Sequence, residues 1–139
     1  LVLHLEYYIT GDPSPYTAYG ILRGIQAAVL QKLNSSSLKN LKVAIQGVGH
    51  VGLDLAARLH SHGAKLYISD INKTALEHCE QQFGATIVDN NEIHKIHCDV
   101  FSPCALGGAI NQKTIDQLNC LIIAGCANNQ LANMELGEK

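Results

Sequence analysis

The hydrophobic pattern of this chain is helical at first and then alternates between strands and helices. Between Ser14 and Leu33, apolar side chains recur every three or four residues, which predicts a helix with one apolar face. Ser14 can cap this helix, and Pro15 suits its first position, where a missing N–H does no harm. The polar stretch 34–40 that follows predicts a loop.

Beyond residue 40, short apolar runs alternate with helical patterns. Most of the runs are continuously apolar, as expected of strands covered on both faces of a parallel sheet. The expected strands are 42–46, 65–70, 85–89, 99–103 and 120–125, and the expected helices are 50–62, 72–83, 91–96 and 111–118. This alternation predicts an α/β fold of the Rossmann type, a doubly wound and mainly parallel sheet of about five strands with flanking helices.

The composition narrows the class of protein without identifying it. The 139 residues suggest one domain, 47% of them are hydrophobic, 16% are charged, and the formal net charge is −2. The absence of a basic block argues against nucleic acid as a partner, and the absence of a long apolar run argues against a membrane span. The start of the chain does not resemble a signal peptide, so we expect a cytoplasmic protein.

The cysteines and histidines give no metal-site pattern. The five cysteines, at positions 79, 98, 104, 120 and 126, form no C-x-x-C pair. We expect reduced, mostly buried thiols and no disulfide framework. The pairs His60-x-His62 and His94-x-x-His97 have no carboxylates or thiols at ligand spacing, so we expect no metal.

The segment GVGHVG matches the pattern G-x-G-x-x-G between an expected strand and an expected helix. The three glycines allow, in order, a tight turn, close approach of a pyrophosphate and close helix–strand packing. Backbone N–H groups at the helix start would then face the phosphates. The residues expected to line this loop are Gly47, Gly49, His50, Val51 and Gly52. The His50 side chain occupies a free position of the pattern, so we treat it as incidental.

An acidic residue ends the next expected strand. Asp70 lies about 20 residues beyond the loop, where a carboxylate can bind ribose hydroxyls, and Ile71 follows it. The carboxylate would repel a 2′-phosphate, which favours NAD over NADP, although Lys73 lies nearby. The alternative is structural: a glycine-rich turn, and an Asp70 that only caps the helix beginning near Asn72.

Five segments resemble one enzyme family, in order and spacing. They are GDPSPYTAYG (11–20), QGVGHVG (46–52), SDINK (69–73), SPCALGG (102–108) and AGCANNQL (124–131). Together they are similar to the Glu/Leu/Phe/Val amino-acid dehydrogenases, most of all to the leucine-oxidising members. The resemblance implies a cofactor-binding domain of an enzyme that uses NAD to convert a branched-chain L-amino acid such as leucine to its 2-oxo acid and ammonia.

The resemblance also implies further contacts with the cofactor. Thr17 would contact the nicotinamide carboxamide, Cys104 and Ala105 would line the ribose region with their backbone, and Asn129 would lie near the nicotinamide and the substrate amino group. Each residue has a structural alternative: Thr17 can help to cap its helix, and the segment around Asn129 can be a plain strand-to-helix turn. The sequence places no histidine or cationic residue beside Cys104 that would activate its thiol, so we do not expect it to act as a nucleophile.

No residue of this chain is expected to be catalytic. The family's catalytic lysine and aspartate belong to a substrate domain that this chain lacks, so the amino acid would bind between this chain and that domain. We expect residues 1–13 to be a hinge or linker remnant, 14–139 to be the dinucleotide-binding domain, and the full-length protein to be a homo-oligomer. Two other interpretations stay open: a non-catalytic NAD-sensing module, and a domain of another two-domain NAD(P) dehydrogenase.

Overall fold

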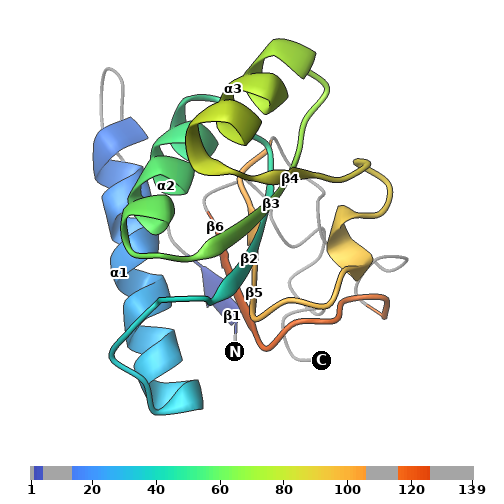
Figure 1. The fold of residues 1–139 in the computed structure, drawn as a ribbon. Coiled ribbons are helices and arrows are strands. Elements are labelled where there is room, and N and C mark those ends of the chain that lie inside the picture. Colours follow the sequence, from blue (N-terminus) through green and yellow to red (C-terminus); the bar gives the residue numbers. More distant parts are fainter. Residues whose placement is uncertain (1, 5–13, 106–115, 126–139) are drawn as a thin grey trace.

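The computed structural model describes residues 2–4, 14–105 and 116–125, which form one parallel sheet with helices on both faces (Figure 1). The six strands have the order β1-β6-β5-β2-β3-β4, and every described strand pair is parallel. The strands are β1 (Val2–His4), β2 (Lys42–Gln46), β3 (Lys65–Ser69), β4 (Thr86–Ile87), β5 (Val100–Pro103) and β6 (Ile122–Gly125). The helices are α1 (Ser14–Leu33), α2 (His50–Ser61), α3 (Lys73–Phe83) and the short 3₁₀ helix η1 (Ile93–Lys95).

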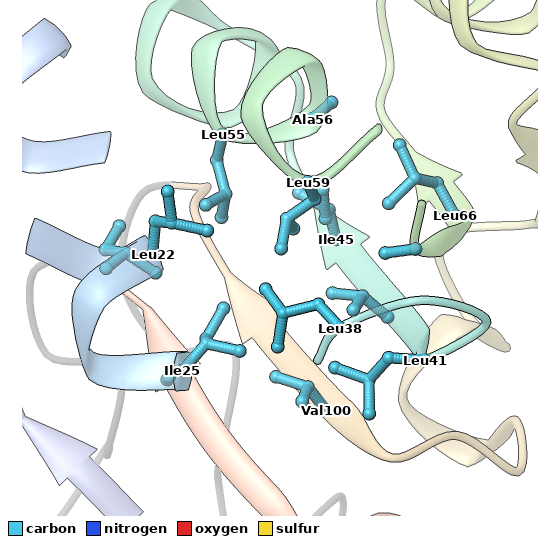
Figure 2. Packing of buried hydrophobic residues seen from close by; sticks show 14 of the residues in the cluster. Leu22, Ile25, Leu38, Leu41, Ile45, Leu55, Ala56, Leu59, Leu66 and Val100 are labelled. Atoms are coloured by element: carbon cyan, nitrogen blue, oxygen red, sulfur yellow. The ribbon is translucent and has the colours of Figure 1, made fainter. Parts of the chain in front are cut away.

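The main core cluster lies between the sheet and the helices α1, α2 and α3. Apolar residues of α1 and α2 meet over β2 and β5 because the three- and four-residue spacing places them on one helix face (Figure 2). Examples from the helices are Ile21, Ile25, Leu55 and Leu59, all of them fully buried. The predicted apolar face of the helix over 14–33 is therefore confirmed.

A second cluster lies on the opposite face of the sheet, beside η1. It contains Phe101 of β5, Ile123 of β6 and Ile93 of η1, packed with Ala44 and Cys98. Successive residues of a strand point to opposite faces, so Val100 belongs to the main cluster while its neighbour Phe101 belongs to the second. Coverage on both faces explains why these strands are continuously apolar.

The predicted α/β class and parallel sheet are confirmed, and all five expected strands are present. A sixth strand, β1, pairs with β6 at one edge of the sheet and was not predicted from its short, isolated pattern. The expected strand 85–89 is reduced to the two residues of β4. The division of the chain at residue 13 remains a prediction, because 5–13 lie outside the described residues.

The expected helix 91–96 is wrong, since the structure has only the single turn η1 there. Asp89 starts a tight turn in which its carboxylate accepts the N–H of Asn91 at 2.7 Å and its backbone oxygen accepts the N–H of Glu92 at 2.9 Å. Ile96 is extended (φ −67°, ψ 144°), which ends the turn. Of the expected helix 111–118, residues 111–115 lie outside the description, and Asp116 and Gln117 form a turn.

Candidate functional site

The glycine loop passes directly from β2 into α2 at the carboxyl edge of the sheet. Gly47 has φ +98°, a conformation that side chains other than glycine rarely adopt. A Cβ atom at this position would lie 2.6 Å from the backbone nitrogen of Ala105. The Gly47 N–H donates to the backbone oxygen of Ser69 at 2.8 Å, which fixes the loop against the end of β3.

The start of α2 is packed tightly on one side and open on the other. A Cβ atom on Gly52 would lie only 1.9 Å from the backbone oxygen of Gly47, so this position requires glycine. At Gly49 an added Cβ would meet nothing within 4 Å. Gly49 is the N-cap of α2 without a side-chain cap, and the first helical bond joins Leu53 N–H to its oxygen at 2.8 Å. The first turn of a helix leaves backbone N–H groups without partners inside the helix, and among the described residues nothing fills the space where a Gly49 side chain would stand.

Asp70 links the glycine loop to the loop after β3. One carboxylate oxygen, Oδ2, accepts the Val48 N–H at 2.7 Å, and the other, Oδ1, accepts the Asn72 N–H at 2.8 Å. The N-cap of α3 is Asn72, whose side chain accepts the Ala75 N–H at 3.1 Å. The alternative in which Asp70 only caps this helix is therefore wrong. Ile71, 91% exposed, lies beside it at the same edge.

The loop after β5 closes the other side of the glycine loop. The Cys104 N–H donates to the Gln46 oxygen at 2.8 Å, and Ala105 contacts Gly47 as described above. The Cys104 Sγ atom lies 3.5 Å from Ser102 Oγ. The structure therefore brings Cys104 and Ala105 to the same edge as the glycine loop and Asp70.

The remaining residues expected at the site differ in where the structure places them. Thr17 lies in the first turn of α1 and is buried, with 6% of its surface exposed. Asn129 lies outside the described residues, so its place near the nicotinamide remains a prediction. His50 is exposed as the first residue of α2, next to Val51, which is partly buried. The binding roles of all these residues also remain predictions.

Sequence reasoning missed two polar residues beneath the loop. Gln46 and Ser69 are opposite each other in the β2–β3 register, and both lie directly before the site segments. Gln46 Oε1 and Ser69 Oγ are buried and have no hydrogen-bond partner in the described part of the chain. Their position at the ends of apolar strands was the only available signal, and it does not distinguish a buried polar residue from the start of a loop.

A buried thiol, Cys79, lies within electrostatic reach of Asp70. Burial raises the pKa of Cys79 on α3, and the negative charge of Asp70 raises this pKa further. Within 2–4, 14–105 and 116–125, no group of three or more His, Cys, Asp or Glu side chains could hold a metal ion. None of the helices in these ranges is long and apolar enough to cross a membrane.

The fold and this edge define a Rossmann-type α/β domain. Its strand order changes direction between β2 and β5, and open α/β sheets bind ligands in the crevice at such a point. The glycine loop, the open start of α2 and the Asp70 carboxylate all lie there. The observed edge therefore has room beside Gly49, exposed backbone donors for an anion and a carboxylate that can accept hydroxyl protons.

Comparison with known proteins identifies the relatives of this domain. No family model matches the chain. Leucine dehydrogenase from Geobacillus stearothermophilus is 48% identical over 133 residues, which cover 96% of this chain and 36% of that protein. L-tryptophan dehydrogenase from Nostoc punctiforme is 47% identical over 127 residues, which cover 91% of this chain and 36% of that protein.

Solved structures give the same relationship. The crystal structure of L-tryptophan dehydrogenase from Nostoc punctiforme superimposes with a TM-score of 0.87 at 46% identity, covering 91% of this chain and 39% of that one. The resemblance to amino-acid dehydrogenases, and to leucine dehydrogenases among them, is confirmed. The similarity to these oxidoreductases covers most of this chain. The chain itself spans about a third of the length of its curated relatives, for example 36% of the Geobacillus enzyme.

Proposed function

We propose that this chain is the cofactor-binding domain of an NAD-dependent amino-acid dehydrogenase that deaminates a branched-chain L-amino acid such as leucine. The main observation is the Asp70 carboxylate, which holds the glycine loop through Val48 and the following loop through Asn72. In an adenosine diphosphate group, the ribose would bind the carboxylate and the diphosphate would bind the open helix start beside it. We infer the reaction class, amino-acid dehydrogenation, from the relatives.

The diphosphate would lie at the start of α2. The Val48 N–H already donates to Asp70, so the donors nearest the open space are the N–H groups of Gly49, His50 and Val51. Gly49 has space for an oxygen atom where a side chain would stand. These N–H groups can donate hydrogen bonds to an anion without rearrangement. The positive end of the helix dipole adds to the attraction of the anion.

The adenosine ribose would lie at Asp70. Each carboxylate oxygen accepts one backbone N–H, and each can still accept a ribose hydroxyl because a carboxylate has about four acceptor positions. The same negative charge would repel a 2′-phosphate, which favours NAD over NADP. Ile71, Cys104 and Ala105 would provide the walls of the adenosine end.

The nicotinamide end would be oriented by Thr17 on α1 and Asn129. When NAD is bound, its nicotinamide supplies the hydride acceptor. Removing the substrate's ammonium proton and activating water need a general base, which we assign to a domain outside this chain. The amino acid would then bind between the two domains, and the complete enzyme would be a cytoplasmic homo-oligomer.

Titration calorimetry of the 139-residue chain tests cofactor binding. We expect NAD to bind with micromolar to millimolar affinity, NADP to bind at least about tenfold more weakly, and leucine with NAD to give no NADH above a no-protein control. Absence of NAD binding by a folded chain would contradict the proposed cofactor role. Deamination by the chain alone would contradict the placement of the catalytic groups elsewhere.

A chimera tests the reaction and its substrate. In the Geobacillus leucine dehydrogenase, the segment matched by this chain would be replaced by the chain itself. We expect NADH formation with leucine and little with tryptophan, measured by absorbance. A folded chimera that reduces NAD with tryptophan in preference to leucine would transfer the assignment to the tryptophan-oxidising relatives.

A further inference from the structure

Two cysteines lie on neighbouring chain segments at the amino edge of the sheet. Cys98 comes two residues before β5, and Cys120 comes two residues before β6. The Cys98 N–H donates to the backbone oxygen of Asn119 at 3.1 Å. Val100 is the register partner of Ile122, and just before these two residues the Asp99 oxygen accepts the N–H groups of Leu121 at 3.2 Å and Ile122 at 3.0 Å, so the two segments stay side by side up to the cysteines.

The spacing of the two segments suits a covalent bond between their thiols. Neighbouring strands lie about 4.8 Å apart, and disulfides need Cα atoms roughly 4.4–6.8 Å apart. Both side chains also pack in the second cluster, around Phe101 and Ile123. The thiols interact electrostatically as well, since a charge on Cys120 raises the pKa of Cys98.

We propose that Cys98 and Cys120 form an oxidation site, which closes to a disulfide between the segments entering β5 and β6 when the protein meets peroxide or a small disulfide. Nothing in this inference depends on the proposed cofactor role, because the site lies at the opposite edge of the sheet from Asp70 and the glycine loop. Both thiols are free in this structure.

Exposure assigns the two thiols different parts in the reaction. Cys120 is half-buried and is the thiol that an oxidant reaches first, while Cys98 is 4% exposed and resolves the product. Peroxide converts the Cys120 thiol to a sulfenic acid and releases one water; the Cys98 thiol then displaces the hydroxyl group, giving the disulfide and a second water. With a small disulfide, Cys120 forms a mixed disulfide, and Cys98 displaces the second small thiol.

The ionisation of both groups sets the rate. Burial raises the pKa of Cys120, while hydrogen bonds from the backbone at Phe101 and Ile122 lower it in part. Burial also raises the pKa of Cys98 to about 12, with further contributions from Cys120 and Asp99. Since the thiolate is the nucleophile, oxidation should be slow at neutral pH and accelerate about tenfold per pH unit in the alkaline range.

Peptide mapping without reduction tests the proposal. The folded chain is treated with hydrogen peroxide or glutathione disulfide at pH 8.5, the remaining thiols are blocked with iodoacetamide, and the digest is analysed by mass spectrometry. We expect one peptide pair joined through Cys98 and Cys120, and before blocking the oxidised chain should be lighter by two hydrogen atoms. Five blocked thiols, or a link through Cys104 or Cys126 instead, would overturn the proposal.

Three variants make the test independent of any single substitution. With glutathione disulfide, C98S should stop at a glutathione adduct on Cys120, because the resolving thiol is missing. C120S should stay unmodified at Cys98, and C79S should form the same disulfide as the wild type. Circular dichroism shows which variants fold. If C98S or C120S does not fold, the wild-type map and C79S still decide, and a wild-type chain that forms no such link refutes the proposal.

Discussion

Two aspartates hold the two ends of β2, and their surroundings differ. At the carboxyl end, Asp70 accepts the Val48 N–H at 2.7 Å. At the amino end, Asp99 Oδ2 accepts the Lys42 N–H at 2.9 Å. Each carboxylate joins a neighbouring strand end to β2 through one backbone donor. The local bond is therefore the same type at both ends of the strand.

The backbone around each aspartate makes the difference. Asp99 is tied into the sheet, since its N–H donates to Lys42 at 2.9 Å and its oxygen accepts the N–H of Ile122 at 3.0 Å. Asp70 lies instead between two loops, next to the open start of α2 at Gly49. A carboxylate is therefore a candidate binding group where its loops leave space beside it, and a structural link where strands enclose it.

The largest expected effect comes from filling the packed side of the glycine loop. Gly52→Ala should lower the free energy of unfolding by about 3 kcal/mol and abolish NAD binding, because its Cβ would lie 1.9 Å from the Gly47 oxygen. Helix propensity alone would favour alanine by about 1 kcal/mol, so a loss isolates the clash. Urea unfolding and calorimetry measure both quantities.

Gly49→Ala is the matched control for that substitution. Its Cβ would meet no atom of the described residues within 4 Å, so stability should change by less than about 1 kcal/mol while NAD affinity falls about tenfold. Unchanged NAD affinity in this variant would place the diphosphate somewhere other than the start of α2.

Removing the negative charge from each aspartate tests the difference between the two ends of β2 directly. Asp70→Asn and Asp99→Asn should each cost about 1 kcal/mol of stability, because Val48 and Asn72 in the first variant, and Lys42 in the second, lose a charged acceptor for their backbone N–H groups. Only Asp70→Asn should weaken NAD binding, by about tenfold, and narrow the preference over NADP. Calorimetry with both cofactors makes the measurement. Equal effects of the two variants on NAD affinity would remove the distinction between the two ends of β2.

The amino end should lose stability at alkaline pH. The pKa of Cys98 is about 12 in the folded chain against 9.0 for an ordinary thiol, so above pH 9 the unfolded chain holds fewer protons. Stability is then fully present below pH 9 and falls by up to about 1.4 kcal/mol per pH unit toward pH 12. Urea titrations at pH 8, 9 and 10 should show this slope reduced in Cys98→Ser and retained in Cys104→Ser.

The smallest expected effect concerns the helix after Asp70. Asn72→Ala removes the acceptor of the Ala75 N–H and should cost about 1 kcal/mol, whereas Asn72→Ser should keep most of the cap. The Asn72 backbone N–H still reaches Asp70 in both variants, so NAD affinity should stay within about twofold. A tenfold loss in Asn72→Ala would show that the cap itself orders the cofactor site.

Local rules predicted the elements with strong periodicity and failed where side chains compete with them. The stripe on α1 and the loop before α2 follow from spacing and from glycine, so both could be predicted from the sequence. The helix expected over 91–96 could not form, because the Asp89 carboxylate bonds to the backbone of its own turn. The short strand β1 needs β6 beside it, which no local pattern reveals.

The candidate site divides in the same way. The glycine loop and the acidic residue after the next strand could be predicted from the sequence alone, because each depends on residue type at a short, fixed spacing. The bond from Val48 to Asp70, the contact of Ala105 with Gly47 and the bond from Cys98 to Asn119 could be found only in the folded structure. These contacts join residues far apart in the chain, and strand order and register, which set them, arise when the whole sheet forms.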